Sequence, residues 1–568
     1  MTEEMEPEST DKILMDRDLA EINAYCSEHF SSIRKRVRQD VETELFLNCQ
    51  RPQVDTTGFC DAQAILPYLT CMRQTIERML TDDALRFSKA RWLWMLRRVP
   101  DPVFEGNVPT TRPYQAALAD AVSGAFGSDN PELPFEDPEH SIRFKIDGSA
   151  LPRLLRFAEL VTWLSQSHVL WRFSGKGVRF RFEQRSTLPA PAPTKDQDEC
   201  IKLYDDRFAK SLTLFGTVGT AISTETDMSD NGFLVSFYSN AEWVQVPVHV
   251  QGEDIEVKVL KRFLPEMISL DGLAKLNEDA RLDGLAWWSP SATAVLALSR
   301  GMFRILASSG NSFVSLLRYG YVFITEEYFL EIFRDGWNAI FKDVLRVVPG
   351  ATIPNSPAAL FDSLVAFQPT LWPLSPRPIV RRAGSAVWID VIACTAILER
   401  SLEFPIVDGG VGNARADHFE GTTQQTINAT SWAPGPALAQ MISREIKKAD
   451  ETKLTDLDAL GEKGQRLILV SCKSMVYSGS YDSGNYVTVR NMRTTAEEAV
   501  QYWAEVVAYV KKHPKGPNYD FSKYEDIIPV VCTPQVVYVA DPYSLRFVEP
   551  GLRAVCSLNE LRTWLTKN

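Results

Sequence analysis

Apolar residues recur at helical spacing through most of the first 120 residues. The clearest stripe includes Ile65, Leu69, Met72 and Ile76, which fall three or four positions apart. Such a period places these side chains on one face of an α-helix. The pattern therefore predicts a mostly helical region over residues 12–123.

The pattern then changes in two steps. A helix is predicted from Leu151 to Ser165, and a short strand from Val178 to Phe182. The next stretch, Ser186 to Thr194, alternates three prolines with small residues. Because this composition favours an extended polyproline conformation, we expect the stretch to be a linker.

The segment that follows reads as β-rich from about Ile201. Short apolar runs predict strands at Leu212–Leu214, Phe233–Tyr238, Val244–Val250 and Ile255–Leu260. Residues 270–343 return to a helical pattern with many aromatic side chains. A proline cluster over residues 349–378 separates this middle region from the rest of the chain.

The last third of the chain shows the order helix, strand, strand, helix, strand. The first helix is predicted from Arg415 to Asn428. Thr455 to Leu460 alternates polar and apolar residues, as a half-buried strand does. Gly461 to Gly464 is a turn signal. Leu467 to Val470 is an unbroken apolar run, which is typical of a central strand.

The second helix of this region carries start and stop signals. Thr495 and Glu498 have the spacing of a capping box. An apolar stripe follows from Ala496 to Val510, and Pro514 comes directly after a basic last turn. Further strands are predicted at Ile527–Cys532 and Val536–Val539.

These elements predict a multidomain α+β or α/β protein. At 568 residues the chain is too long for one ordinary core. We place a mostly helical N-terminal region at residues 1–185 and a mixed α/β middle region at residues 195–350. A C-terminal domain is expected at residues 385–568.

Composition and charge narrow the class of protein. Hydrophobic residues at 45% and charged residues at 24% are typical of soluble globular proteins. No secretory leader is visible, and the most apolar windows fall short of a membrane span. We therefore expect a cytoplasmic protein without membrane contact. The net charge of −12 indicates that any contact with DNA is a confined site.

The cysteines and histidines do not predict a zinc site. Nine cysteines are scattered without CxxC spacing, and the six histidines do not cluster. An odd number of thiols fits a reducing compartment. The chain also lacks the GxxxxGK[S/T] pattern of a P-loop motor.

Two acidic residues and a lysine lie at the ends of the two predicted strands. Asp456 and Asp458 share one face of the first strand, because side chains alternate along a strand. By the same parity, Ser471 and Lys473 share one face of the second. A six-residue loop, Gly461 to Arg466, would place Asp458 one diagonal step, about 7 Å, from Ser471. A four-residue loop would keep these faces but increase that separation, so the register stays open.

This grouping has the chemistry of a divalent-metal site. Two nearby carboxylates repel each other unless a cation or a proton relieves them. Mg²⁺ binds through one or two carboxylates while keeping several waters, and it lowers the pKa of a bound water. Lys473 would add a fixed positive charge near an attacked phosphate.

The segments TDLDAL (455–460) and LILVSCK (467–473), in this order of elements, resemble the core of the PD-(D/E)XK nuclease superfamily. The preceding pair Phe419-Glu420 is similar to the family's first helix. The resemblance covers residues 412–568. It implies a restriction-endonuclease-like αβββαβ core.

The resemblance also implies roles for individual residues. By it, Asp458 is the main metal ligand and Lys473 the catalytic lysine. Glu420 is an auxiliary carboxylate that also reaches the metal, and Gln501 lies near the site on the following helix. The expected cofactor is Mg²⁺ or Mn²⁺.

One position departs from the family pattern. Ser471 occupies the place of the second carboxylate, and a hydroxyl is a weaker metal ligand. Either Asp456 or Glu420 replaces it, or activity is lost. Ser471 stays among the catalytic candidates. Cys472 is a further candidate metal ligand, beside the simpler interpretation of a small buried residue.

The resemblance implies a metal-dependent endonuclease that cleaves DNA, in restriction or in defence against foreign DNA. The alternative is an inactive nuclease fold that binds nucleic acid or acts as a scaffold, with protein partners or as a homo-oligomer. Two basic and aromatic stretches, Arg86–Arg98 and Trp171–Arg185, are further candidates for phosphate contact. For the first stretch, a core helix with a solvated basic side is the favoured interpretation.

Overall fold

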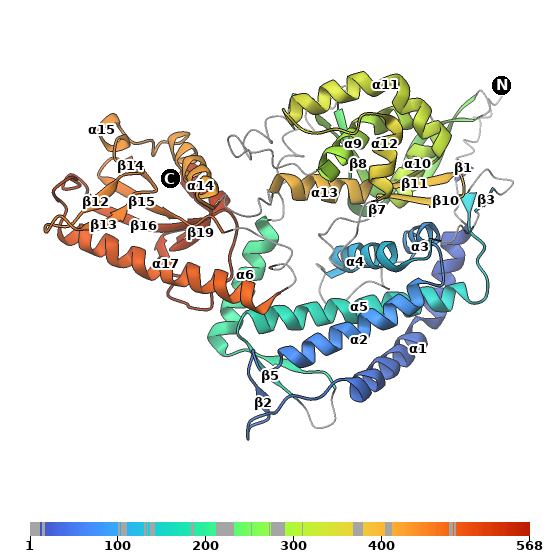
Figure 1. Cartoon of the computed structure of the whole chain (residues 1–568), viewed down its shortest axis with the longest axis horizontal. Helices are drawn as coiled ribbons and strands as arrows, with labels where there is room; N and C mark the ends of the chain where they lie inside the picture. The colour runs from blue at the N-terminus through green and yellow to red at the C-terminus, as the bar shows by residue number, and fades with distance from the viewer. Residues whose placement is uncertain are drawn as a thin grey trace, which may run out of the picture.

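The computed structural model shows a chain of helices and several small sheets (Figure 1). It describes residues 12–13, 17–99, 103, 111–129, 132, 134–136, 142–182, 187–211, 232–250, 253–271, 273, 290–308, 310–366, 379–403, 412–475, 481 and 484–568. The strand expected at Leu212–Leu214 lies outside these residues. The mixture of helices and small sheets is consistent with the predicted α+β multidomain class.

The N-terminal region is helical, as the apolar period predicts. Its helices are α1 (Arg17–Asn48), α2 (Leu66–Ala84), α3 (Lys89–Leu96), α4 (Thr111–Phe126) and α5 (Ala150–Gly175). The long helices α1, α2 and α5 pack side by side (Figure 1). The predicted helix from Leu151 to Ser165 is part of α5, which continues to Gly175.

A disulfide joins two of these helices. Cys49, which follows α1, is bonded to Cys71 in α2. The other seven cysteines are buried free thiols. No helix in the described ranges has the length and apolar content needed to cross a bilayer.

The expected linker is partly a strand. Residues 187–194 include β6 (Ala190–Ala192), which pairs antiparallel with β5 (Arg179–Arg181). β5 pairs in turn with β2 (Phe59–Cys60). The prolines give extended backbone, as predicted, but β5 holds that backbone against the helices. A second small pair, β3 (Phe135–Glu136) and β4 (Ile142–Arg143), lies before α5.

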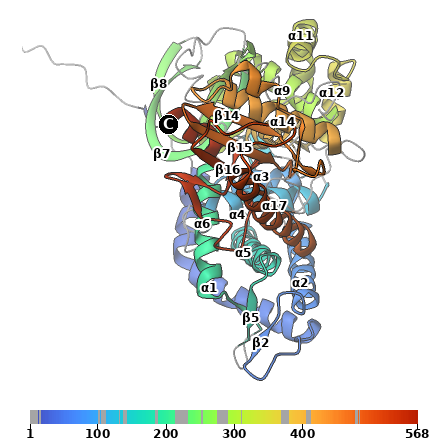
Figure 2. The same ribbon diagram turned by 90° about the vertical axis from the view of Figure 1, so that its left-hand side faces the viewer.

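The middle region begins with a helix, although β-rich structure was expected from about Ile201. Residues 195–211 form α6 (Lys195–Ser211), and the first strand described after it begins at Gly232. Strands β7 (Gly232–Val250) and β8 (Glu253–Ser269) then form one long antiparallel hairpin, which Figure 2 shows as a curved ribbon. It includes the three other predicted strands. The short β1 (Lys12–Ile13) pairs with β8.

The rest of the middle region, predicted at residues 195–350, is largely helical where it is described. It contains α9 (Pro290–Ser308), α10 (Gly310–Tyr319), β9 (Tyr321–Thr325) and α11 (Glu326–Val347). The elements that follow are α12 (Pro357–Val365), β10 (Val380–Ala383), β11 (Ala386–Asp390) and α13 (Val391–Glu403). β11 and α13 lie beyond residue 385 but pack against β9 and α9 of this region. Strands β10, β11 and β9 form an antiparallel sheet. Within the expected proline cluster, Pro357 begins α12, because its missing N–H has no helical partner at that position.

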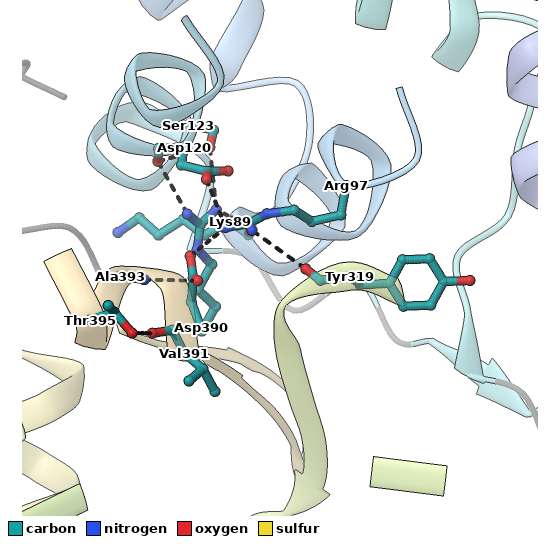
Figure 3. A network of polar contacts seen from close by, with 10 residues as sticks. Lys89, Arg97, Asp120, Ser123, Tyr319, Asp390, Val391, Ala393 and Thr395 are labelled. Carbon is teal, nitrogen blue, oxygen red and sulfur yellow. Dashed lines mark hydrogen bonds and ion pairs between the residues drawn. The ribbon is translucent and has the colours of Figure 1, made fainter. Parts of the chain in front are cut away.

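A buried ion network links the N-terminal helices to this sheet (Figure 3). The guanidinium of Arg97, just after α3, donates to Asp120 of α4 at 2.7 Å and to Asp390 of β11 at 2.8 Å. All three side chains are at most 4% exposed. Arg381 of β10 also donates to the carbonyl of Asp120. The two parts therefore meet through buried charge as well as apolar packing.

The network corrects one sequence-based interpretation. The stretch Arg86–Arg98 is a core segment, with Trp92 and Trp94 fully buried, but of its basic residues only Arg86 is exposed. Arg97 and Arg98 are buried as well. In the second stretch, Arg179 is ion-paired with Asp55 and Asp61, so it is not a free phosphate contact.

The C-terminal region is built around a four-stranded sheet. The elements before it are α14 (Gly412–Asn428), α15 (Pro436–Ala439), β12 (Glu445–Lys447) and β13 (Lys453–Asp456). The sheet order is β14 (Ala459–Lys463), β15 (Arg466–Cys472), β16 (Asp526–Thr533) and β19 (Val555–Ser557). β14 is antiparallel to β15, and the other pairs are parallel.

Helices cover both faces of this sheet (Figure 1). α17 (Tyr486–Lys512) packs on the face that carries Leu467 and Leu469. α14 and α18 (Leu558–Lys567) pack on the opposite face, against Ile468 and Val470. The apolar run of β15 is thus buried on both sides, as predicted for a central strand.

Two predicted boundaries in this region are wrong. α17 begins at Tyr486, where the side chain of Asn485 caps it, so Thr495 and Glu498 lie inside the helix and form no capping box. Residues 536–539 form no strand, because β19 occupies the free edge of β16. β17 (Phe547–Glu549) and β18 (Leu552–Arg553) form a separate small hairpin before β19.

Candidate active site

The β14–β15 hairpin sets the position of Asp458. Its turn contains only two residues, since Lys463 pairs with Arg466, and Gly464 adopts a φ of 62° that favours glycine. Neither the six-residue loop nor the four-residue loop considered from the sequence is therefore present. Ala459 pairs with Val470, so Asp458 precedes the pair and faces Ser471 directly.

Gly461 serves packing rather than the turn. It lies in the middle of β14, where a Cβ atom would come within 2.6 Å of both Ile427 Cγ2 and the carbonyl oxygen of Trp432. The glycine thus lets β14 approach α14 closely. The segment 455–460 is also not one strand, because β13 ends at Asp456 and pairs with β12 instead.

The carboxylate of Asp458 is held by the end of β15. Its Oδ2 accepts a hydrogen bond from the backbone N–H of Cys472 at 2.7 Å and from the hydroxyl of Ser471 at 3.3 Å. Burial raises the pKa of Asp458, and these two bonds and the charge of Lys473 oppose that increase. Within the described structure Oδ1 accepts no hydrogen bond, so one carboxylate oxygen remains for another ligand.

Glu420 brings a second carboxylate to this place. It lies on α14 and is partly buried. Burial and then the charge of Asp458 raise the pKa of Glu420 to about 7, with Asp417 adding to the increase. The charged form of Asp458 therefore disfavours ionisation of Glu420.

Lys473 completes the group. It directly follows β15, and its backbone N–H donates to the carbonyl of Cys532 at 2.9 Å. Its charge lowers the pKa of both Asp458 and Glu420. Asp458, Glu420 and Lys473 thus lie within range of one another's charge.

Ser471 and Cys472 lie beside Asp458 in different ways. The Ser471 hydroxyl donates to Asp458, so it orients this carboxylate. The Cys472 thiol belongs to the opposite face of the sheet, in the cluster with Phe419. Burial and the charge of Asp458 raise the pKa of this thiol far above its usual value. The thiol stays protonated near neutral pH, which is unfavourable for metal binding.

Two other candidate residues are less closely tied to this group, although the charge of Asp456 adds to the raised pKa of both Asp458 and Glu420. Asp456 is exposed and forms an ion pair with Lys453 at 2.6 Å. Gln501 is exposed on α17, and within the described residues it makes no hydrogen bond to Asp458.

Sequence reasoning missed a residue that holds the site together. The buried amide of Gln424 donates to the carbonyl of Leu460 and accepts from its N–H, both at 2.9 Å. Leu460 lies in the edge strand β14, so this clamp ties α14 to the strand that follows Asp458. Its one signal in the sequence is its position one helical turn after Glu420.

The raised pKa of Glu420 predicts a pH-dependent stability. The folded state holds this proton up to about pH 7, whereas the ordinary pKa is 4.5. Stability from this group is therefore full below the ordinary value and is lost as pH rises through about 7. Glu420→Gln should flatten this loss and be relatively more stable at alkaline pH. Urea unfolding at about pH 5 and about pH 8 measures the effect.

A matched control for this test is Glu505→Gln, which changes an exposed glutamate on α17. It should leave the pH dependence of the wild type unchanged. An equal pH dependence in Glu420→Gln and wild type would show that Glu420 titrates as an ordinary surface glutamate.

The carboxylates at this site fit a cation that keeps most of its waters better than a cation surrounded by protein ligands. Within the described ranges no three His, Cys, Asp or Glu side chains are arranged to hold a metal. Two carboxylates with raised pKa values remain, and Mg²⁺ needs no more than one or two when waters fill its other positions. No protein family model, no curated protein and no solved structure matches this chain.

Proposed function

We propose that this chain is a metal-dependent nuclease that hydrolyses phosphodiester bonds in DNA. The observation that carries the proposal is the electrostatic coupling of Asp458, Glu420 and Lys473 at the end of the buried strand β15. The charge of Asp458 disfavours ionisation of Glu420 there, and the charge of Lys473 lowers the pKa of both carboxyl groups. Perturbed acids that share a charged partner are a common property of catalytic sites.

Asp458 and Glu420 are the residues that would hold Mg²⁺ or Mn²⁺. When bound, such an ion supplies a more acidic water and stabilises negative charge on an attacked phosphate. Ser471 and the N–H of Cys472 fix Asp458 Oδ2, so Oδ1 is directed to its ligand without further ordering. Gln424 keeps α14, and with it Glu420, against β14.

Lys473 has a separate role in the proposal. Hydrolysis joins a water oxygen to phosphorus while one ester P–O bond breaks, and negative charge accumulates on the phosphate oxygens. A lysine at the strand end places a fixed positive charge beside them, without reorganisation during the reaction.

The alternative is a nuclease fold that binds nucleic acid without cleaving it. Ser471 favours this alternative, because a hydroxyl stands at the family's second carboxylate position and engages Asp458. Binding without cleavage would then be the function of the site.

The full-length protein should cleave plasmid and linear duplex DNA, or single-stranded DNA, with Mg²⁺ or Mn²⁺ and not with EDTA. Gel analysis of the products over time measures this activity. DNA binding without cleavage under either metal would reject the nuclease proposal and favour the inactive fold.

A further inference from the structure

Two aromatic rings are exposed near the C-terminus. Tyr543, in the turn before β17, is 50% exposed, and Phe547, the first residue of β17, is 58% exposed. Of the three residues between them, Ser544 and Leu545 are buried and Arg546 is partly buried. The surface here is therefore formed by the two rings and their charged neighbours, not by a continuous apolar patch.

Each ring lies against an arginine. The guanidinium of Arg546 is 3.6 Å from the ring centroid of Tyr543, and that of Arg553 is 4.0 Å from the ring centroid of Phe547. Arg546 also donates to the carbonyl of Tyr543, and Arg553 to the carbonyl of Leu545. One face of each ring is thus covered by a fixed cation, and much of the ring remains open to solvent.

The backbone under these side chains is well fixed. Asp541 accepts hydrogen bonds from the N–H groups of Tyr543 and Ser544. Phe547 pairs with Arg553 across the β17–β18 hairpin. Such anchoring lowers the entropy lost when a ligand orders the rings.

The two acidic side chains of residues 541–553 have partners within the protein. Asp541 forms the turn just described, and Glu549 is ion-paired with Arg466 at 2.5 Å. Arg546 and Arg553 form no ion pair within the described residues. The surface consequently combines open aromatic faces with positive charge, on a chain whose net charge is −12.

We propose that Tyr543, Arg546, Phe547 and Arg553 form a platform that binds single-stranded nucleic acid. Unpaired bases stack on aromatic rings, and nearby arginines contact the phosphates and strengthen stacking. Paired bases in a duplex do not offer these faces. The proposal rests on the proposed nuclease function, because it specifies the substrate class that reaches the same domain.

The position of the platform suits this role. It lies beside β19, since Ala554 between β18 and β19 donates to the carbonyl of Arg546. β19 and β14 are the two edges of the four-stranded sheet, three strand spacings or about 14 Å apart. The platform is thus distinct from the carboxylate site, which lies at the β14 edge.

Binding of fluorescent oligothymidylate and oligouridylate to the full-length protein, in EDTA and followed by anisotropy, tests the platform. Wild type should bind a single strand more tightly than a duplex. Tyr543→Ala and Phe547→Ala should each weaken single-strand binding about tenfold, the typical contribution of one stacked base. Tyr543→Phe keeps the ring and should bind like wild type. The two oligonucleotides show whether DNA or RNA is preferred.

Phe46→Ala is the matched control, because Phe46 is an aromatic residue 77% exposed at the end of α1. It should leave binding unchanged. Wild-type affinity in both alanine variants, or no single-strand binding by wild type, would overturn the platform. So would a change of oligomeric state in these variants with binding unchanged, which would indicate a protein contact.

Cleavage assays with Mg²⁺ separate the two proposals. Metal-dependent cleavage with normal single-strand binding in the alanine variants rejects the platform alone. Loss of binding in the variants of a protein that cleaves nothing supports the platform and rejects the nuclease.

Discussion

Arg97→Leu should lower the free energy of unfolding by about 3–5 kcal/mol, the usual result of leaving buried charges without their partner. Arg97 is 4% exposed and bridges Asp120 and Asp390, which are 2% and 0% exposed. The substitution would leave two carboxylates buried together. Because Asp390 also accepts from the N–H of Ala393 at the start of α13, the loss should reach both the helices and the sheet.

Urea unfolding of the full chain measures this effect, and Arg382→Leu is the matched control. Arg382 lies on β10, next to the buried Arg381. It is 40% exposed and forms an ion pair with Glu326 at 2.9 Å. An exposed pair contributes about 0–1 kcal/mol, so the control should change little. An equal decrease in the free energy of unfolding of the two variants would show that the buried Arg97 network stabilises the fold no more than the exposed pair does.

A double variant refines the test. Asp120→Asn in the Arg97→Leu background removes one of the two uncompensated charges, so part of the lost stability should return. If Asp120→Asn instead lowers the free energy of unfolding of the Arg97→Leu variant as much as it lowers that of the wild type, the two side chains are not electrostatically coupled.

This network also shows what the sequence could not predict. The helical period correctly indicated that Arg86–Arg98 contains a core segment. The partner of Arg97 on β11, however, lies 293 residues away along the chain. No local pattern reports such a contact, and arginines are usually exposed, so a solvated basic face was the natural but wrong expectation.

The elements around the candidate site were predictable to a larger extent. The apolar run of β15, the following Lys473 and the helix with Glu420 are local features, and the structure places Lys473, Glu420 and Asp458 within range of one another's charge. The register was not predictable, because Gly461 and Gly464 look alike in the sequence. Only Gly464 forms the turn, whereas Gly461 is required by the close approach of α14.

The predicted start of α17 was wrong because the sequence contains two candidate N-cap residues. Asn485 and Thr495 are both good helix caps, and the chain uses Asn485. β-rich structure was expected from about Ile201, but Ile201 lies in α6 and is buried in the core cluster of the C-terminal sheet. Arg207 of α6 also pairs with Glu560 of α18. Tertiary packing here decides between helix and strand.

Asp458→Asn and Lys473→Met should each reduce metal-dependent cleavage by at least about 10²–10³-fold, the usual loss when a group that stabilises transition-state charge is removed. The amide introduced by Asp458→Asn would keep an oxygen for the N–H of Cys472 but could not neutralise a cation. Gel analysis of the cleavage products over time, with Mg²⁺ or Mn²⁺, measures both losses.

The fold should persist in both variants, which separates loss of chemistry from loss of structure. Burial raises the pKa of Asp458, so a neutral amide there removes an unfavourable charge, and the melting temperature should not fall. Lys473 is only partly buried at a strand end.

Asp456→Asn and Lys453→Met are matched controls, because this exposed ion pair on β13 carries the same side-chain types. Wild-type cleavage by Asp458→Asn, or an equal loss in the controls, would show that the carboxylates at the end of β15 are not the catalytic centre.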